Sequence, residues 1–213
     1  MNKSVAIVDY GIGNILSVRR ALEHAGAAAV LAADASDIAR ADYLVLPGVG
    51  AFRDGMSGLA RYGAAEAVAS HAAAGKPLLG ICLGAQMLMS TSEEFGTHKG
   101  LDLIPGKVVQ IPSTGADGAP HKLPYIGWAD IAEARPGSFA GTSLATVAAG
   151  TAVYLVHGFH IDPMREEDRI AVYDYNGVQV TAAIHNENVT GMQFHPEKSG
   201  PVGLRILQSF LGV

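Results

Sequence analysis

The chain has 213 residues, of which 49% are hydrophobic and 16% are charged, and its formal net charge is −5. This composition excludes a disordered chain, and the scattered Lys and Arg residues exclude a basic nucleic-acid-binding patch. No apolar run of about 18 residues predicts a membrane span. The single cysteine, Cys82, excludes an internal disulfide and suits a reducing compartment, so without a recognisable signal peptide we expect a cytoplasmic protein.

The first half of the chain alternates between short apolar runs and segments of helical periodicity. Such alternation predicts a parallel sheet that is buried on both faces by helices. The expected strands are residues 5–8, 29–31, 43–46 and 77–81. The expected helices are residues 16–25 and 52–74, and Gly63 should interrupt the second one.

The second half is richer in strands, with little helix between them. The expected strands are residues 108–111, 152–156, 170–173, 178–184 and 191–194, followed by an amphipathic helix over 202–211. Residues 112–121 are the most linker-like stretch, but they are too few to mark a domain boundary. The sequence therefore predicts one α/β domain over residues 1–213, with a parallel core and an antiparallel extension in the second half.

The strongest chemical signal is Gly80-Ile81-Cys82-Leu83-Gly84, at the point where a predicted strand passes into a helix. Its form matches the nucleophile elbow, in which glycines allow a sharp strained turn that exposes a nucleophile. The following helix N-terminus favours a thiolate and places the N–H of Leu83 to receive an oxyanion. The alternative is a buried cysteine that packs as a small hydrophobic residue, and the flanking glycines argue against it.

A nucleophilic thiol needs a base, and the base needs a partner that fixes its tautomer. His195 ends an apolar strand, and Glu197 follows two residues later across Pro196, so the carboxylate can reach the imidazole. His157 is the rival base. The other histidines have weaker claims: His185 lies on a strand, and His24, His71, His98 and His121 are expected in loops or at the surface. None of the eight stands at a metal-ligand spacing, so no metal is expected.

One glycine-rich loop and two polar residues complete the candidate site. The loop Pro47-Gly48-Val49-Gly50 follows the third strand and, unless it is an ordinary tight turn, offers the N–H of Val49 or Gly50 as a second oxyanion donor. The glycines at positions 11 and 13 begin a pattern typical of dinucleotide binding, but Leu16 stands where that pattern needs a small residue. Nucleotide binding by the segment 9–14 is therefore not expected. Gln86 lies one helical turn after Cys82 and could hold a substrate, whereas Glu94 is either an ammonium contact or a solvated surface charge.

Taken together, these segments resemble the class I (triad type) glutamine amidotransferases, and more narrowly the glutaminase subunits of imidazole glycerol phosphate synthase. The cysteine elbow and His195-Pro196-Glu197 are typical of the whole class. Tyr10-Gly11-Ile12-Gly13-Asn14, the loop 47–52 and Lys198 are typical of the narrower group. The resemblance extends over nearly the whole chain and implies a flavodoxin-like glutamine amidotransferase fold.

The resemblance implies a role for each matching residue. Cys82 would be the nucleophile, His195 the base and acid, and Glu197 the residue that orients His195. The glutamine contacts would be Gln86, Glu94, Gly158 and Phe159, and the residues facing a partner would be Asn14 and Lys198. Two positions depart from the group: Ala129 stands where relatives often have Asn, and Gly158 where they often have Ser.

The implied reaction is hydrolysis of L-glutamine to glutamate and ammonia, for which thiolate and imidazole suffice without a cofactor. A chain of this length has no room for a (β/α)₈ cyclase, so the ammonia would pass to a separate cyclase subunit in a heterodimer. That subunit would make imidazole glycerol phosphate and AICAR in histidine biosynthesis. The alternatives are a glutaminase of another synthase, such as pyridoxal phosphate synthase, a related cysteine peptidase or γ-glutamyl hydrolase, and a non-catalytic binding module.

Overall fold

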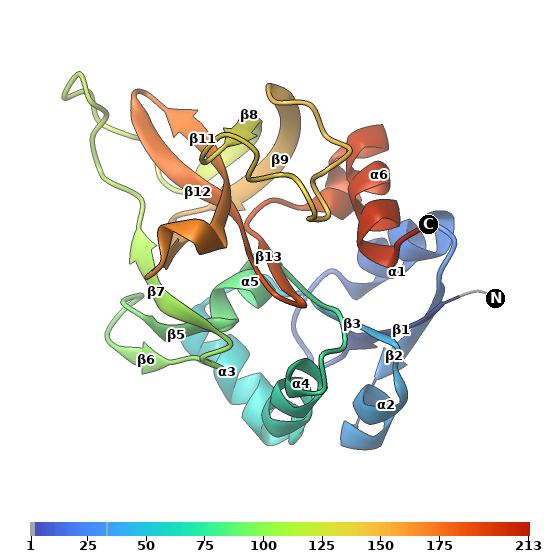
Figure 1. The fold of residues 1–213 in the computed structure, drawn as a ribbon. Helices are drawn as coiled ribbons and strands as arrows, with labels where there is room; N and C mark the ends of the chain where they lie inside the picture. The colour runs from blue at the N-terminus through green and yellow to red at the C-terminus, as the bar shows by residue number, and fades with distance from the viewer. Residues whose placement is uncertain (1–2, 33) are drawn as a thin grey trace.

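The computed structural model describes residues 3–32 and 34–213. A nine-stranded sheet with the order β2-β1-β3-β4-β13-β12-β11-β8-β9 crosses the molecule (Figure 1). Neighbours from β2 to β13 pair in parallel, and the remaining neighbours pair antiparallel. The parallel strands are β1 (Ser4–Val8), β2 (Ala28–Ala32), β3 (Tyr43–Leu46), β4 (Leu78–Ile81) and β13 (Val189–Met192). The antiparallel strands are β8 (Tyr125–Glu133), β9 (Thr151–His157), β11 (Arg169–Tyr175) and β12 (Val178–Asn186).

Helices cover both faces of the parallel strands, as Figure 1 shows. On one face lie α1 (Ile15–His24) and α6 (Gly200–Leu211), and on the other lie α2 (Ala35–Arg40), α3 (Phe52–Arg61) and α4 (Ala64–Ala73). Successive residues of β1 alternate between two hydrophobic clusters, with Val5 and Ile7 in one and Ala6 and Val8 in the other. Because strand side chains alternate between faces, the continuous apolar run of β1 reflects burial on both sides.

A second, four-stranded sheet has the order β10-β7-β5-β6. It is formed by β5 (Met89–Ser92), β6 (His98–Lys99), β7 (Ile104–Gln110) and β10 (Phe159–Pro163). The short helix α5 (Leu83–Met87) leads directly into it, and the 3-10 turns η1 (Glu166–Asp168) and η2 (Pro196–Lys198) complete the structure. This sheet carries Glu94 and Phe159 to the side of the Cys82 turn, as the lining of their shared cavity shows.

The predicted elements of the first half are confirmed within one or two residues, with α2, β5 and β6 as the omissions. The second half needs three corrections. β13 joins the parallel part of the main sheet beside β4. The second sheet was not expected, because its strands are short or interrupted by Pro105 and Gly106. β8 was also missed, since its side chains are mostly exposed or half-exposed and form no apolar run.

Among the described residues, no helix has both the length and the apolar character that crossing a membrane would require.

Candidate active site

Cys82 lies between β4 and α5 with φ 54° and ψ −110°, a backbone conformation that is costly for a residue with a Cβ. The turn depends on its two flanking glycines. A Cβ on Gly84 would lie 1.7 Å from the carbonyl oxygen of Leu46, and one on Gly80 would lie 2.8 Å from the backbone of Ala85. The sequence therefore forms a strained strand-to-helix elbow that holds the thiol at the carboxyl end of the parallel strands.

His195 and Glu197 form a buried pair next to this thiol. Nδ1 of His195 lies 2.8 Å from Oε1 of Glu197, and the two side chains are only 3% and 2% exposed. Burial lowers the pKa of His195, but its side-chain interactions with Cys82 and Glu197 outweigh burial and raise this pKa to about 9. Nε2 of His195 makes no hydrogen bond with the described residues. The imidazole therefore has one nitrogen fixed by a carboxylate and the other free for proton transfer.

His157, the rival base, is also buried, but both of its ring nitrogens are occupied. Nδ1 lies 2.9 Å from the carbonyl oxygen of Phe159, and Nε2 lies 3.1 Å from the hydroxyl of Tyr173. Burial lowers the pKa of His157 to about 3. A carbonyl only accepts, so Nδ1 carries the proton and Nε2 accepts from Tyr173. With neither nitrogen free, His157 is not placed to exchange a proton with the thiol.

Two of the histidines expected at the surface or in loops are buried. His71 is 3% exposed on α4, and its Nε2 lies 3.2 Å from the carbonyl oxygen of Pro77. His121 is 8% exposed and stacks on Tyr175 at a centroid distance of 3.9 Å. Both side chains are apart from the cavity at Cys82, so the correction concerns packing and leaves the site unchanged.

The loop Pro47–Gly50 lies directly against the Cys82 turn because β3 and β4 are parallel neighbours. A Cβ added to Gly48 would lie 3.0 Å from Cβ of Leu83 and 2.4 Å from the hydroxyl of Tyr10. That hydroxyl, which is buried, donates a hydrogen bond of 2.7 Å to the carbonyl of Pro47. The Tyr10 segment is thus a support beneath the loop, a role that sequence reasoning missed.

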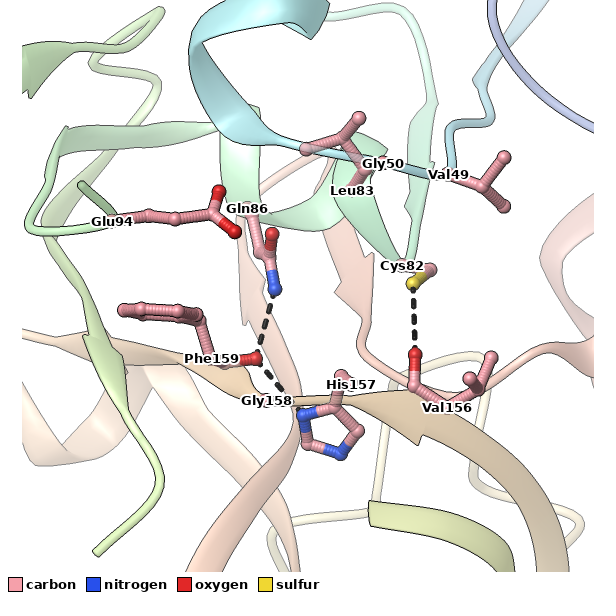
Figure 2. Close-up of a pocket in the computed structure, with 10 residues that line it drawn as sticks. All are labelled: Val49, Gly50, Cys82, Leu83, Gln86, Glu94, Val156, His157, Gly158 and Phe159. Carbon is pink, nitrogen blue, oxygen red and sulfur yellow. Dashed lines mark hydrogen bonds between the residues drawn. The ribbon is translucent and has the colours of Figure 1, made fainter. Parts of the chain in front are cut away.

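A cavity of about 170 Å³ opens beside the thiol (Figure 2). Cys82 and Glu94 lie on opposite sides of it, with Gln86 between them. Its lining includes every residue that the sequence suggested for oxyanion or substrate binding: Val49, Gly50, Leu83, Gln86, Glu94, Gly158 and Phe159. Val156 and His157 complete the lining.

Hydrogen bonds hold the polar residues of this cavity in place. Oε2 of Glu94 accepts a hydrogen bond of 2.6 Å from the backbone N–H of Phe52, at the start of α3, so Glu94 is not a freely solvated surface charge. Nε2 of Gln86 donates to the carbonyl of Phe159 at 2.9 Å. The carboxylate of Glu94 and the carboxamide oxygen of Gln86 can accept hydrogen bonds from an ammonium group, so the cavity suits a zwitterionic amino acid as ligand.

Sequence reasoning also missed Gln193, which is completely buried between β13 and His195. Its Nε2 lies 3.9 Å from Sγ of Cys82, and its Oε1 lies 3.3 Å from Nε2 of Gln86. The signal that could have found it is a polar side chain at the end of an otherwise apolar strand, two residues before His195.

Asn14 and Lys198 lie at the surface near the His195–Glu197 pair. Asn14 caps α1 through a hydrogen bond from the N–H of Ser17, and it shares a small cavity with His195 and Glu197. Nζ of Lys198 lies 5.7 Å from the ring centroid of Tyr154. Among residues 3–32 and 34–213, no group of three His, Cys, Asp or Glu side chains is arranged to hold a metal ion.

Comparisons with known proteins identify the family of this chain. The family model "Glutamine amidotransferase class-I" matches residues 6–212. The chain is 49% identical over 211 residues to the imidazole glycerol phosphate synthase subunit HisH 1 of Legionella pneumophila (strain Paris), covering 99% of both chains. It is 45% identical over 208 residues to the subunit HisH of Syntrophotalea carbinolica, covering 97% of this chain and 98% of that one.

Solved structures share the fold at lower identity. PurLQS from Thermotoga maritima matches with a TM-score of 0.73 and 22% identity, over 100% of this chain and 99% of that one. The glutaminase domain of Trypanosoma brucei CTPS, solved with bound acivicin, matches with a TM-score of 0.65 and 16% identity, over 99% and 94%. From the family match and the full-length relatives, the chain belongs to the class I glutamine amidotransferases and, within them, to the group of imidazole glycerol phosphate synthase HisH subunits.

Proposed function

We propose that this chain is the glutaminase subunit of imidazole glycerol phosphate synthase, with Cys82, His195 and Glu197 as its catalytic triad. It hydrolyses L-glutamine to glutamate and ammonia and passes the ammonia to a separate cyclase subunit. The observation that carries the proposal is the strained Cys82 elbow beside the buried His195–Glu197 pair, in a chain that matches HisH subunits over its whole length. A free thiol nucleophile suits a reducing compartment, which supports a cytoplasmic location for the complex.

In the first half of the reaction, the Cys82 thiolate attacks the side-chain amide carbon of glutamine. The carbonyl π electrons move to oxygen and form a tetrahedral oxyanion, which collapses to a thioester when the C–N bond breaks. The raised pKa of His195, about 9, keeps its imidazole protonated near neutral pH, so it can give a proton to the leaving nitrogen as ammonia forms. Glu197 stabilises the imidazolium and fixes its orientation.

In the second half, water attacks the thioester carbon. His195, now neutral, takes a proton from that water, and the second tetrahedral intermediate breaks its C–S bond to release glutamate. The backbone N–H of Leu83 and an N–H of Val49 or Gly50 are the donors for the oxyanion in both halves. Removal of one such donor typically costs about 3–4 kcal/mol of transition-state stabilisation.

Glutamine fits the cavity with its amide at Cys82 and its α-amino group towards Glu94. The carboxylate of Glu94 keeps one oxygen apart from its bond to Phe52, and Gln86 keeps its carbonyl oxygen free, since its amide nitrogen donates to Phe159. Both oxygens can accept from an ammonium group. The backbone at Gly158 and Phe159 closes the same cavity.

The cyclase would dock over the surface that surrounds His195. Trp128, 55% exposed, packs edge-on against Tyr154 at 5.9 Å, and Tyr154 lies 6.4 Å from His195 by ring centroids. Lys198 lies over the same Tyr154 ring. Exposed aromatic side chains rimmed by a cation are typical of protein interfaces. The small cavity that Asn14 shares with His195 and Glu197 lies on this side, where ammonia would leave.

Replacement of the nucleophile tests the proposal. In the complex with its cyclase, Cys82→Ala should abolish glutamine-dependent synthesis of imidazole glycerol phosphate, whereas added ammonium salts should still support it. Loss of both activities would assign Cys82 a structural role and contradict the proposal. Offering the wild-type chain other synthases in place of the cyclase would show which one stimulates glutamine hydrolysis, and stimulation by a different synthase alone would contradict the choice of partner.

A further inference from the structure

Gln193 occupies the buried side of the Cys82 thiol. The side chain is 0% exposed, and its Nε2 lies 3.9 Å from Sγ of Cys82. Among the described residues, Sγ is the hydrogen-bond acceptor that the structure offers this nitrogen, because the bond to Gln86 uses the carboxamide oxygen of Gln193 instead. A buried amide N–H without a partner is costly, so the contact with sulfur satisfies the donor.

The orientation of the Gln193 amide follows from the residues behind it. Nε2 of Gln86 has two hydrogens, and its two acceptors are the carbonyl of Phe159 at 2.9 Å and Oε1 of Gln193 at 3.3 Å. Because Gln86 donates, the atom of Gln193 that faces it must be oxygen. The NH₂ group of Gln193 then has to face Cys82. An amide flip would place two donors against each other and an oxygen against the thiolate.

The chain of hydrogen bonds extends further, to Tyr173. The carbonyl of Phe159 also accepts from Nδ1 of His157, and Nε2 of His157 accepts from the hydroxyl of Tyr173. Burial keeps the pKa of His157 near 3, so the imidazole stays neutral and the direction of each bond is preserved at working pH. Tyr173 is itself 1% exposed, which places the far end of the chain in the core.

We propose that Gln193 is a positioning residue for the glutaminase reaction, donating a hydrogen bond to the Cys82 thiolate, and that the chain through Gln86, Phe159, His157 and Tyr173 keeps its amide in the donating orientation. The inference rests on the proposed function in one respect, the role of Cys82 as nucleophile. A donor fixed beside the sulfur favours the thiolate over the thiol. It also holds Sγ in place when the thiolate gives up the hydrogen bond of 3.9 Å that the thiol donates to the carbonyl of Val156.

Other titratable groups surround the thiol and have to be kept constant in a test. They are His195 after β13, Tyr10 after β1, His157 at the end of β9, and Glu94 across the cavity. None of the substitutions below alters these side chains. Because the chain contains one cysteine, alkylation by iodoacetamide reports on Cys82 without interference from other thiols.

The test is the pH dependence of iodoacetamide alkylation for the full chain. Gln193→Met keeps the volume of the side chain and removes the donor. The midpoint of the alkylation profile should move up by about one pH unit, with an up to tenfold slower reaction at neutral pH. An unchanged midpoint would overturn the proposal.

Thr190→Val is the matched control. Thr190 is a buried polar residue on β13, but its hydroxyl bonds His185 at 3.0 Å and has no contact with the chain of bonds to Cys82. The profile of this variant should coincide with that of the wild type. An equal shift in both variants would mean that general loosening of β13 is responsible, and would also overturn the proposal.

A second variant keeps the test decisive if Gln193→Met fails to fold. Gln193→Leu removes the donor without adding a titratable group, so the midpoint should rise by about as much as in Gln193→Met. Tyr173→Phe removes the far anchor and should shift the midpoint in the same direction by a few tenths of a pH unit. An unchanged Tyr173→Phe profile would overturn the part of the proposal that runs through His157.

Alkylation of the isolated chain and glutamine hydrolysis by the complex test the inference about Gln193 and the proposed function separately. If the profile shifts as expected but the wild-type complex does not hydrolyse glutamine, the proposed function fails and the hydrogen bond from Gln193 stands. If the complex hydrolyses glutamine and the profile of Gln193→Met does not move, the inference about Gln193 fails by itself.

Discussion

Two buried histidines lie near the Cys82 turn, and their environments give them opposite properties. His195 sits against the Glu197 carboxylate, which together with Cys82 raises its pKa to about 9. His157 has only neutral partners, a carbonyl and a tyrosine hydroxyl, and burial lowers its pKa to about 3. Burial alone therefore does not decide the protonation of a histidine, because a nearby negative charge can outweigh the cost of desolvation.

The comparison assigns the two histidines different roles: His195 can transfer protons, and His157 supports the geometry of the site. An imidazole with one free nitrogen and a carboxylate behind it can give and take a proton at the reacting atoms. An imidazole with both nitrogens occupied serves as a rigid link between backbone and core. Substitutions at these residues and at the nearby surface test this division.

The largest effect should come from His195→Ala. Glutamine hydrolysis in the complex should fall by about 10³-fold or more, because the reaction loses both its acid and its base. Ammonia-dependent synthesis should persist, since the cyclase does not use this imidazole. Steady-state assays with glutamine and with ammonium chloride measure both activities, and a loss below tenfold would contradict the assignment.

Glu197→Gln should follow, with hydrolysis reduced by about 10²- to 10⁴-fold. The carboxylate raises the pKa of His195, so its removal should move that pKa down from about 9, and less imidazolium would remain at neutral pH. NMR titration of the His195 ring protons can measure the change. A pKa that stays near 9 would show that Glu197 is not responsible for holding the proton.

His157→Phe should reduce hydrolysis far less, by about tenfold, while the pH dependence of the remaining activity keeps its shape. The substitution leaves the buried Tyr173 hydroxyl without its partner, at a cost of about 1–3 kcal/mol in the free energy of unfolding. Urea unfolding and pH–rate profiles provide the measurements. A pH profile that loses one of its limbs would make His157 a proton carrier and reverse the comparison.

Stability should depend on pH in opposite directions for the two histidines. The pKa of His157 is lowered in the folded state, so its contribution is present above the ordinary histidine pKa of about 6.5 and is lost as pH falls towards 3. The pKa of His195 is raised, so its contribution is present below about 6.5 and is lost as pH rises through 9.

Each histidine should contribute up to about 1.4 kcal/mol per pH unit within its own range. Chemical unfolding of the wild type and of His157→Phe between pH 4 and 6.5 can measure the first contribution. The variant should have the shallower slope on the acid side. Identical slopes would indicate that His157 is protonated in the folded state.

The smallest effect should come from Lys198→Ala, at the exposed rim on the His195 side. We expect the cyclase to bind about three- to tenfold more weakly, because a rim cation contributes modestly to affinity and more to the association rate. Titration of the cyclase, followed by stimulated glutamine hydrolysis, measures the change. Unaltered binding at low and high salt would place the partner elsewhere on the surface.

The local features of this protein could be predicted from its amino-acid sequence. The apolar runs and helical periods predicted the parallel core, because a strand that is buried on both faces has a continuous run of apolar residues in the sequence. The glycines around Cys82 predicted the elbow, since only glycine tolerates backbone contacts as close as those of Gly84 with Leu46. His195 and Glu197 could be paired because they are two residues apart.

The remaining features depend on contacts between segments that are far apart in the sequence. Cys82 and His195 meet because β4 and β13 are parallel neighbours, although most of the chain's second half lies between them in sequence. The same pairing brings Gln193 to the sulfur, and the unexpected second sheet brings Glu94 and Phe159 to the cavity. The raised pKa of His195 also depends on Cys82, which is distant in sequence, and the lowered pKa of His157 depends on its burial. The local sequence pattern predicts which faces of a strand are buried, but it does not predict which strands pair. In this protein, strand pairing brings Cys82, His195 and Gln193 together, and their contacts determine the chemistry of the site.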